Sequence, residues 1–288
     1  MSGVAGAERI RNRADFAEFL ISYQNLISKF LGFVNLCPSG SYNSDLFKQD
    51  FGDMDLIVHI QSDRDKSQVK RDLQEFLISQ PPEMIVPFSS ERYLGRRSYN
   101  AGELITVRYH DQHLGYSIQI DNIVALSAEE ADFKLRFLNI PAEKQGLILG
   151  LVKIATIETP VNELLDRMGI EASTNIAHNQ EYEFNLSGSE FSLRLVTYHP
   201  GTFKQESRST IWSSNEFANV TKLLYQYDLD SDFLELLSQC QYMIRNPRSH
   251  HRVTGIFNSM ITVKSGELGT IKGYRKQLAQ TQIQEAFR

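Results

Sequence analysis

Along the first 130 residues, apolar positions follow a helical period in some segments and a strand pattern in others. Apolar residues recur at helical spacing from Asp15 to Phe33, which predicts a helix there. Val34 to Cys37 reads as a short strand, and Met54 to Ile60 as a longer one because it is rich in apolar and β-branched residues. An amphipathic helix is expected from Asp65 to Ile78, followed by the helix-breaking pair at Pro81.

Two more strands are predicted before residue 130. Leu104 to Tyr109 and Tyr116 to Ile123 flank a turn in which His110 and His113 are expected at the surface. Glu83 to Gly102 is interpreted as a strand followed by an irregular loop. The second strand alternates between an apolar and a polar face. The apolar face takes Ile118, Ile120 and Asn122, and the polar face takes Ser117, Gln119 and Asp121.

The pattern changes near residue 130, which predicts a domain 1–130 followed by a mainly helical domain 131–288. An α+β fold is therefore expected. The second part holds apolar helical stretches and one β-hairpin signal, together with a second, weaker turn between two short strands. These segments are Glu129 to Leu138, Gly146 to Ile157, a helix start at Pro160, a hairpin from Tyr182 to Val196, an interrupted helix from Phe217 to Leu237, and the turn between Thr262 and Thr270.

Composition narrows the class of protein. The chain has 288 residues, 41% of them hydrophobic, and a formal net charge of -5, which argues against a protein that coats nucleic acid by bulk charge. The two cysteines, Cys37 and Cys240, have no metal-binding spacing and are interpreted as buried thiols. No segment approaches the roughly 18 apolar residues of a membrane span. A soluble, cytoplasmic protein with no membrane partner is expected.

The chemistry-bearing stretch is Gly40-Ser41, followed after eleven residues by Asp53-Met54-Asp55. Glycine allows a tight turn and a close approach to a ligand, and Ser41 adds a hydroxyl beside an expected helix start. Asp53 and Asp55 are two residues apart at a predicted strand, so both carboxylates should lie on one face. Such close carboxylates repel each other unless a cation lies between them, and hard oxygen ligands suit Mg²⁺ or Mn²⁺.

A third carboxylate is expected from a neighbouring strand, and Asp121 fits because it lies on the polar face of the strand beginning at Tyr116. Three such carboxylates could hold two ions for displacement at phosphorus. The alternative for Asp121 is a residue that caps a turn at the strand end. Asp53-x-Asp55 on its own is commonly a solvated strand edge, and Gly40-Ser41 alone is uninformative.

Taken together, Gly40-Ser41, Asp53-x-Asp55 and Asp121 resemble the DNA polymerase β-like nucleotidyltransferase superfamily. The resemblance covers roughly residues 30 to 125. It implies a mixed β-sheet with helices on one side, and a helical domain that closes over the nucleotide. It also implies that Gly40 and Ser41 hold the triphosphate, and that Asp53, Asp55 and Asp121 are metal ligands and catalytic residues. The acidic loop with Asp45 and Asp50 departs from the family pattern.

Lys153 is the only charged residue between Gly146 and Ile157. Similar enzymes place a lysine after the catalytic domain, where it reaches the β- and γ-phosphates, so the resemblance makes Lys153 a candidate nucleotide-binding residue. The alternative is a lysine whose stem packs on apolar neighbours while its ammonium group reaches solvent. Basic residues from Arg245 to Arg252 either contact nucleic-acid phosphate or form an exposed loop, and Arg96-Arg97 leaves similar alternatives.

The predicted function is a magnesium-dependent nucleotidyltransferase that moves a nucleoside monophosphate from an NTP, ATP included, to a hydroxyl and releases pyrophosphate. The acceptor is left open among an RNA 3′ end such as that of tRNA, a nucleotide, a small molecule and a protein. The alternative is a catalytically silent nucleotide-binding or scaffold module of the same fold. Base preference and oligomeric state are not predicted.

Overall fold

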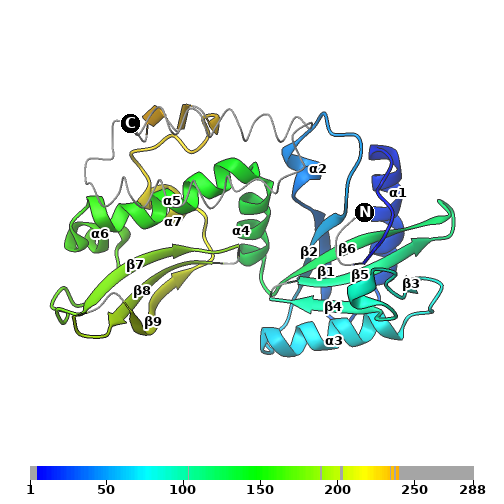
Figure 1. The fold of residues 1–288 in the computed structure, drawn as a ribbon, viewed down its shortest axis with the longest axis horizontal. Coiled ribbons are helices and arrows are strands. Elements are labelled where there is room, and N and C mark those ends of the chain that lie inside the picture. The colour runs from blue at the N-terminus through cyan, green and yellow to red at the C-terminus, as the bar shows by residue number, and fades with distance from the viewer. Residues whose placement is uncertain are drawn as a thin grey trace. The chain divides into compact units, whose positions relative to one another are not determined.

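A computed structural model describes residues 5–239 except 103, 189, 202–203, 234 and 237. The chain divides into two compact units, Met1–Pro141 and Ala142–Arg288 (Figure 1). The sequence analysis placed this boundary after residue 130. Helix α4 (Ala128–Asn139) lies within the first unit because it packs against strands of that unit's sheet.

The first unit is built on a mixed six-stranded sheet in the order β1-β2-β6-β5-β3, with β4 paired to β5. The sheet is antiparallel except for one parallel pair, β2 with β6. The parallel pair brings together residues that are about 65 positions apart, which is what joins the two aspartate-bearing stretches. The strands are β1 (Phe33–Pro38), β2 (Met54–Ile60), β3 (Ile85–Val86), β4 (Ser98–Ala101), β5 (Leu104–Asp111) and β6 (Tyr116–Ala125).

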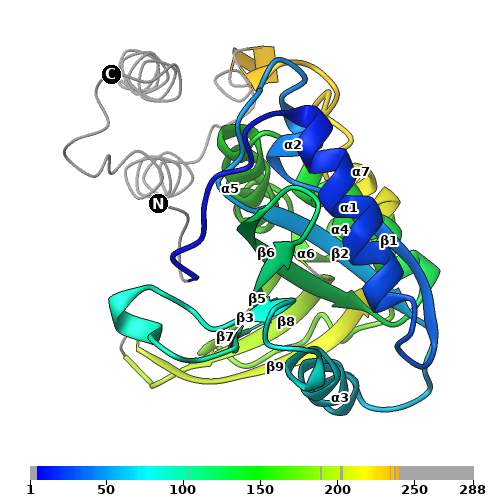
Figure 2. The ribbon, with the colours of Figure 1, turned by 90° about the vertical axis from the view of Figure 1, so that its right-hand side faces the viewer.

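One face of this sheet carries the main hydrophobic core. Helices α1 (Arg13–Ile27) and α3 (Lys66–Ser79) cover it with apolar side chains that meet the even-numbered residues of β2 and β6 (Figure 2). Asn12 and Asp65 begin these helices by accepting hydrogen bonds from backbone N–H groups of the first turn. The core includes Phe16, Phe19, Tyr23, Val69, Leu73, Leu77, Leu56, Val58, Ile118, Ile120 and Val124.

The opposite face carries a smaller apolar cluster under α4, made by odd-numbered strand residues such as Ile57, Ile123 and Ala125. Helices therefore lie on both faces of the sheet, whereas the sequence analysis expected them on one side only. Odd-numbered residues nearer the start of β2 and the middle of β6 lie beyond this cluster, and they include Asp55 and Asp121. The α4 face of the sheet is thus apolar at one end and polar at the other.

Predicted and observed elements agree best where the pattern is strongest. Strand β2 has the predicted bounds, and β5, β6, α3 and α4 match within about two residues. Helix α1 ends at Ile27 rather than at Phe33, and Gly32, with a φ of 85°, turns the chain into β1 and leaves Leu31 exposed. Residues 83–102 hold strand β4, where an irregular loop was expected, and a short 3₁₀ turn, Glu91–Tyr93.

The second unit combines helices with a three-stranded antiparallel sheet in the order β7-β8-β9. The predicted hairpin is present as β7 (Gln180–Leu186) and β8 (Phe191–Tyr198). Strand β9 (Gln205–Ser214) was not predicted; nearly all of its residues are exposed. The labelled helices are α5 (Ala142–Glu158), α6 (Val161–Met168) and α7 (Ala218–Leu223).

Three predictions fall on residues outside the described part of the chain: the thiol of Cys240, the basic stretch from Arg245 to Arg252, and the turn between Thr262 and Thr270. Cys37 is half-buried in β1, and burial raises the pKa of its thiol. Among the described residues, no helix has the length and apolar character needed to cross a membrane.

Candidate metal and nucleotide site

Asp55 and Asp121 are direct neighbours across the parallel strands β2 and β6. Register partners on adjacent strands have side chains on the same face of a sheet, so both carboxylates leave the sheet on its α4 face. Asp121 is buried, at 7% exposed, and Asp55 is partly buried. The pairing predicted from sequence between the Asp-x-Asp motif and the later strand is therefore present in the fold.

Asp53 completes the set from the loop before β2. It precedes the first residue of the strand, Met54, whereas the sequence analysis placed it on the strand. Burial, together with the negative charges of Asp53 and Asp121, raises the pKa of the Asp55 carboxyl to about 7. Burial also raises the pKa of Asp121, and the negative charge of Asp53 acts in the same direction. The three aspartates thus form one electrostatically coupled group.

Gly40 lies directly against this group. A Cβ atom added at residue 40 would come within 2.5 Å of Oδ2 of Asp55, and the backbone there has φ 67° and ψ -140°, a conformation that only glycine adopts readily. Ser39 fixes the approach, because its backbone N–H donates to the Asp55 carbonyl oxygen at 2.9 Å. The glycine of the Gly40-Ser41 motif is required by the close packing of this turn against the Asp55 carboxylate.

Ser41 and Lys48 bring a hydroxyl and a cation to the same turn. The Lys48 ammonium donates to Oγ of Ser41 at 2.7 Å, and its charge lowers the pKa of Asp55. Arg13 holds the intervening loop by donating to the carbonyl oxygens of Tyr42 at 3.0 Å and Asp45 at 2.7 Å. Helix α2 (Ser41–Ser44) is a single turn, so the polar character of this segment comes from these side chains more than from a helix dipole.

The Asp121 carboxylate is held by two neighbours that the sequence analysis did not assign to the site. Oγ1 of Thr106, its register partner on β5, donates to Oδ1 at 2.5 Å. The Gln119 amide donates to Oδ1 at 3.2 Å and to Oδ2 at 3.1 Å. All three side chains are buried. The signal for Gln119 was present in the alternation of β6, which put it on the same face as Asp121.

The donor chemistry of this group fits a divalent cation. Three carboxylates share a partly buried environment, and their mutual repulsion is relieved by a positive charge of the kind that Mg²⁺ supplies. Within the described part of the chain, the His, Cys, Asp and Glu side chains do not gather into a closed coordination set of three or more. Like-charged groups favour such a looser arrangement, and hydrogen bonds from Thr106 and Gln119 hold Asp121 in place.

Lys153, the remaining predicted site residue, is half-buried on α5 in the second unit. Its backbone carbonyl oxygen accepts a hydrogen bond from Oγ1 of Thr156 at 2.9 Å. The structure brings Gly40, Ser41 and the aspartates together within the first unit. The role of Lys153 stays a prediction.

Arg97 and His110 form contacts within the fold that the sequence did not suggest. The Arg97 guanidinium donates to the carbonyl oxygens of Ile78, Gln80 and Ile85, so it joins the end of α3 to β3 instead of forming a flexible loop. His110 belongs to β5, not to the turn after it, and its Nδ1 lies 3.1 Å from Oγ of Ser117. His113 is exposed in the turn, as expected.

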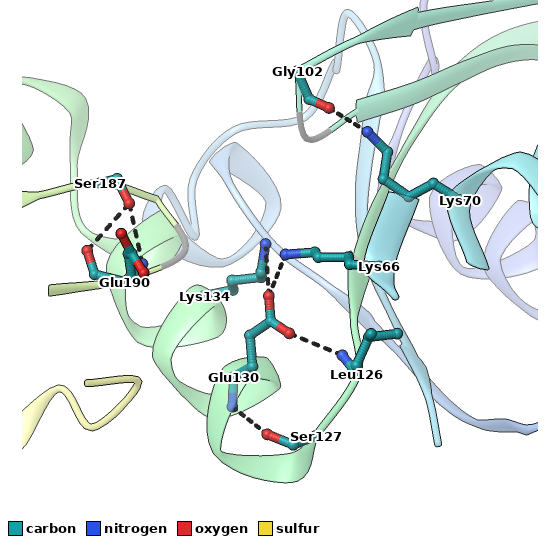
Figure 3. A network of polar contacts seen from close by, with 9 residues as sticks. All are labelled: Lys66, Lys70, Gly102, Leu126, Ser127, Glu130, Lys134, Ser187 and Glu190. Atoms are coloured by element: carbon teal, nitrogen blue, oxygen red, sulfur yellow. Dashed lines mark hydrogen bonds and ion pairs between the residues drawn. The ribbon is translucent and has the colours of Figure 1, made fainter. Parts of the chain in front are cut away.

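A second polar network lies where α3 and α4 begin (Figure 3). The Glu130 carboxylate forms an ion pair with Lys66 and accepts a hydrogen bond from the backbone N–H of Leu126 at 2.9 Å. Nζ of Lys134, whose side chain is fully buried, lies 3.4 Å from the same carboxylate. A buried lysine needs such an anionic partner. These contacts fasten α4 to the strand end after β6, at the end of the strands away from Asp55.

Comparison with protein-family models finds no match to this chain, and comparison with curated proteins finds none either. Function is therefore inferred from the geometry of the site.

Proposed function

We propose that the chain is a metal-dependent nucleotidyltransferase that moves a nucleoside monophosphate from an NTP to a hydroxyl acceptor and releases pyrophosphate. The observation that carries the proposal is the alignment of Asp55 with Asp121 on parallel strands, with Gly40 packed against the Asp55 carboxylate. We further infer that the mixed sheet of the first unit is of the nucleotidyltransferase type.

Asp53, Asp55 and Asp121 would hold the Mg²⁺ or Mn²⁺ ions. When bound, such ions supply charge neutralisation at the triphosphate and make a hydroxyl more acidic. Asp121 is held in place, because Thr106 donates to one of its oxygens and Gln119 donates to both. Asp55 would reach the same cation as Asp121, because β2 is paired in register with β6. The chain thus supplies three carboxylates on adjacent segments, of which Asp121 is fixed by hydrogen bonds.

The turn at Gly40 is the proposed triphosphate site. Because residue 40 has no side chain, this turn packs directly against the Asp55 carboxylate, so a triphosphate bound at the turn would lie beside the proposed metal ligands. The hydroxyl of Ser41 and the ammonium group of Lys48 already contact each other at 2.7 Å, and both are suitable donors to phosphate. Lys48 also offsets part of the acidic character that Asp45 and Asp50 give to this loop.

The test is to incubate the purified chain with each of the four α-³²P-labelled NTPs, Mg²⁺ and total cell RNA or protein. The expected result is magnesium-dependent release of pyrophosphate and labelling of one acceptor class, with neither in EDTA. The Asp53→Ala variant should abolish both. Asp63→Ala, which removes an exposed carboxylate in the segment after the C-terminal end of β2, should abolish neither. NTP binding without turnover in wild-type protein would contradict the proposal and identify a silent nucleotide-binding module.

Lys153→Ala tests the proposed role of Lys153 in nucleotide binding. If the Lys153 ammonium contacts the β- or γ-phosphate, the variant should bind NTP about tenfold more weakly, equivalent to the loss of one charge-assisted hydrogen bond. Its melting temperature should change little, because the side chain is only half-buried. Isothermal titration with a non-hydrolysable NTP measures the affinity. Equal affinities in the variant and in wild-type protein would remove Lys153 from the site.

A further inference from the structure

Residues 5–10 contact both stretches of chain that carry the aspartates. The backbones of Ile10 and Phe51 exchange two hydrogen bonds, at 2.9 and 3.0 Å, and Phe51 precedes Asp53 by two residues. Two residues earlier, the backbone N–H of Glu8 donates to the carbonyl oxygen of Ser117 at 2.9 Å, and Ser117 belongs to β6. One short segment therefore joins the loop of Asp53 to the strand of Asp121.

The same segment reaches the Asp121 carboxylate through the side chain of Gln119. The backbone N–H of Ala5 donates to Oε1 of Gln119 at 3.2 Å, across 114 positions of sequence. The Nε2 atom of that amide donates to both oxygens of Asp121, at 3.2 and 3.1 Å. The chain of hydrogen bonds runs from the backbone of Ala5, through Gln119, to the carboxylate.

The contact with Ala5 determines which way the Gln119 amide faces. With the amide reversed, its NH₂ group would meet the Ala5 N–H, donor against donor, and its oxygen would meet the Asp121 carboxylate, acceptor against acceptor. Gln119 is only 4% exposed, so water cannot readily replace the lost partners. The Ala5 N–H therefore selects the orientation in which Gln119 donates to Asp121.

The segment is closely fitted to its position. Ala5 and Ala7 are buried against Phe88, and Ser89 holds the segment by hydrogen bonds to the carbonyl oxygens of Ala5 and Gly6. At Gly6 the backbone has a φ of 61°, and an added Cβ atom would come within 2.6 Å of the backbone nitrogen of Ser90. Only small residues fit between the β6 strand and the loop that follows β3.

We propose that residues 5–10 form a clasp that fixes the spacing of Asp53 and Asp121, and that Gln119 is a positioning residue through which the clasp orients the Asp121 carboxylate toward a divalent cation. The proposal rests on the proposed function and deepens it. Residues that hold a metal ligand in place typically contribute 10- to 100-fold to metal affinity. Opening the clasp should accordingly weaken binding of the cation although every ligand is retained.

The experiment is a double-mutant cycle in the full chain with Ala5→Pro, which removes the N–H donor, and Gln119→Met, which removes the amide at nearly constant volume. Electron paramagnetic resonance titration measures the affinity for Mn²⁺ alone. Gln119→Met should weaken binding about tenfold and Ala5→Pro less. The double variant should bind Mn²⁺ as Gln119→Met does, because the two residues act through one contact. Losses that multiply in the double variant, or no loss in Ala5→Pro, would overturn the clasp.

Asn122→Leu is the matched control, because Asn122 is a fully buried amide on the same strand but on the opposite face. It should lower stability and leave the Mn²⁺ affinity unchanged. A deletion of residues 2–6 removes the same donor without introducing proline, and it must show the same non-additivity with Gln119→Met. If wild-type protein binds no Mn²⁺, the proposed function fails. The same cycle in the free energy of unfolding then decides the clasp: non-additive losses support it and additive losses overturn it.

Discussion

The two faces of strand β6 are equally buried and hold opposite kinds of side chain. On the face toward α1 and α3, Ile118 and Ile120 join the main core. On the other face, Gln119 and Asp121 are buried in a network of hydrogen bonds. Burial of apolar surface stabilises a fold by roughly 25 cal/mol per Å², whereas burial of a carboxylate destabilises it unless a partner compensates. One face of β6 thus maintains the fold, while the other costs stability and carries a proposed metal ligand.

The largest expected effect is on the polar face. Residues that only support a metal ligand contribute at most roughly 100-fold to activity. Because Asp121 is itself a proposed ligand, Asp121→Ala should lower nucleotide transfer by more than that. The protein should remain folded, because the change removes a carboxylate whose pKa is raised by burial and by Asp53. Turnover and circular dichroism measured on the same preparation check both statements. An unfolded variant, or one with wild-type turnover, would break the proposed division between the faces.

The matched change on the apolar face is Ile120→Ala. Ile120 is fully buried in the main core, so its truncation should lower the free energy of unfolding by about 2–5 kcal/mol. Turnover per folded molecule should stay near that of wild-type protein, because the side chain points away from Asp121. Urea unfolding combined with activity at low temperature makes the measurement. A stable variant with low turnover would contradict the assignment of this face to the core.

Gly40→Ala and Gly115→Ala sharpen the comparison. Both glycines have positive φ, so each alanine should cost on the order of 1 kcal/mol or more of stability. Only residue 40 lies against a carboxylate, since a Cβ at residue 115 meets nothing within 4 Å. Gly40→Ala should therefore displace the Asp55 carboxylate and lower turnover, while Gly115→Ala should lower stability alone. Equal turnover in the two variants would show that close packing at Gly40 has no catalytic role.

The remaining expected effect is a change of stability with pH in metal-free protein, which alters no turnover. The pKa of Asp55 is raised to about 7 in the folded state, from an ordinary value near 4 in the unfolded chain. The folded state therefore binds more protons between these values, and the contribution of Asp55 to stability falls as pH rises from about 4 to 7, by at most about 1.4 kcal/mol per pH unit.

Asp55→Asn removes this contribution without changing the size of the side chain. The stability of the variant relative to wild-type protein should therefore increase with pH over the same range. Urea midpoints in EDTA at several pH values, and the same series with Mg²⁺, measure the difference. A difference between the two proteins that does not vary with pH would show that Asp55 carries no raised pKa.

The sequence was sufficient to predict the elements whose side chains follow a strong local pattern. The run from Met54 to Ile60 defines β2, and the alternation after Tyr116 assigns Asp121 and Gln119 to one face of β6. The resemblance to nucleotidyltransferases then predicts that the motif aspartates and Asp121 belong to one site. Their proximity across the parallel pair agrees with that prediction.

The elements that were missed depend on partners far away in sequence. Strands β4 and β9 are rich in polar residues and owe their extended form to pairing with β5 and β8. Residues 5–10 show no periodic pattern of apolar residues. Their position depends on hydrogen bonds to residues more than 40 positions away, which no local pattern reveals. Arg96-Arg97 looked like a solvated basic pair because nothing local reveals the carbonyl oxygens that Arg97 contacts.

The clasp also constrains the order of events during biosynthesis. Ala5 and its partner Gln119 are 114 positions apart, and ribosomes add about 5–20 residues per second. Residues 5–10 therefore leave the ribosome roughly 6 to 20 s before β6 does, and during that interval Ala5 and Glu8 lack the β6 groups to which their N–H groups donate. A segment that is translated before the sheet thus completes its contacts only once β6 has been made, so the hydrogen bonds that hold the Asp121 carboxylate form late.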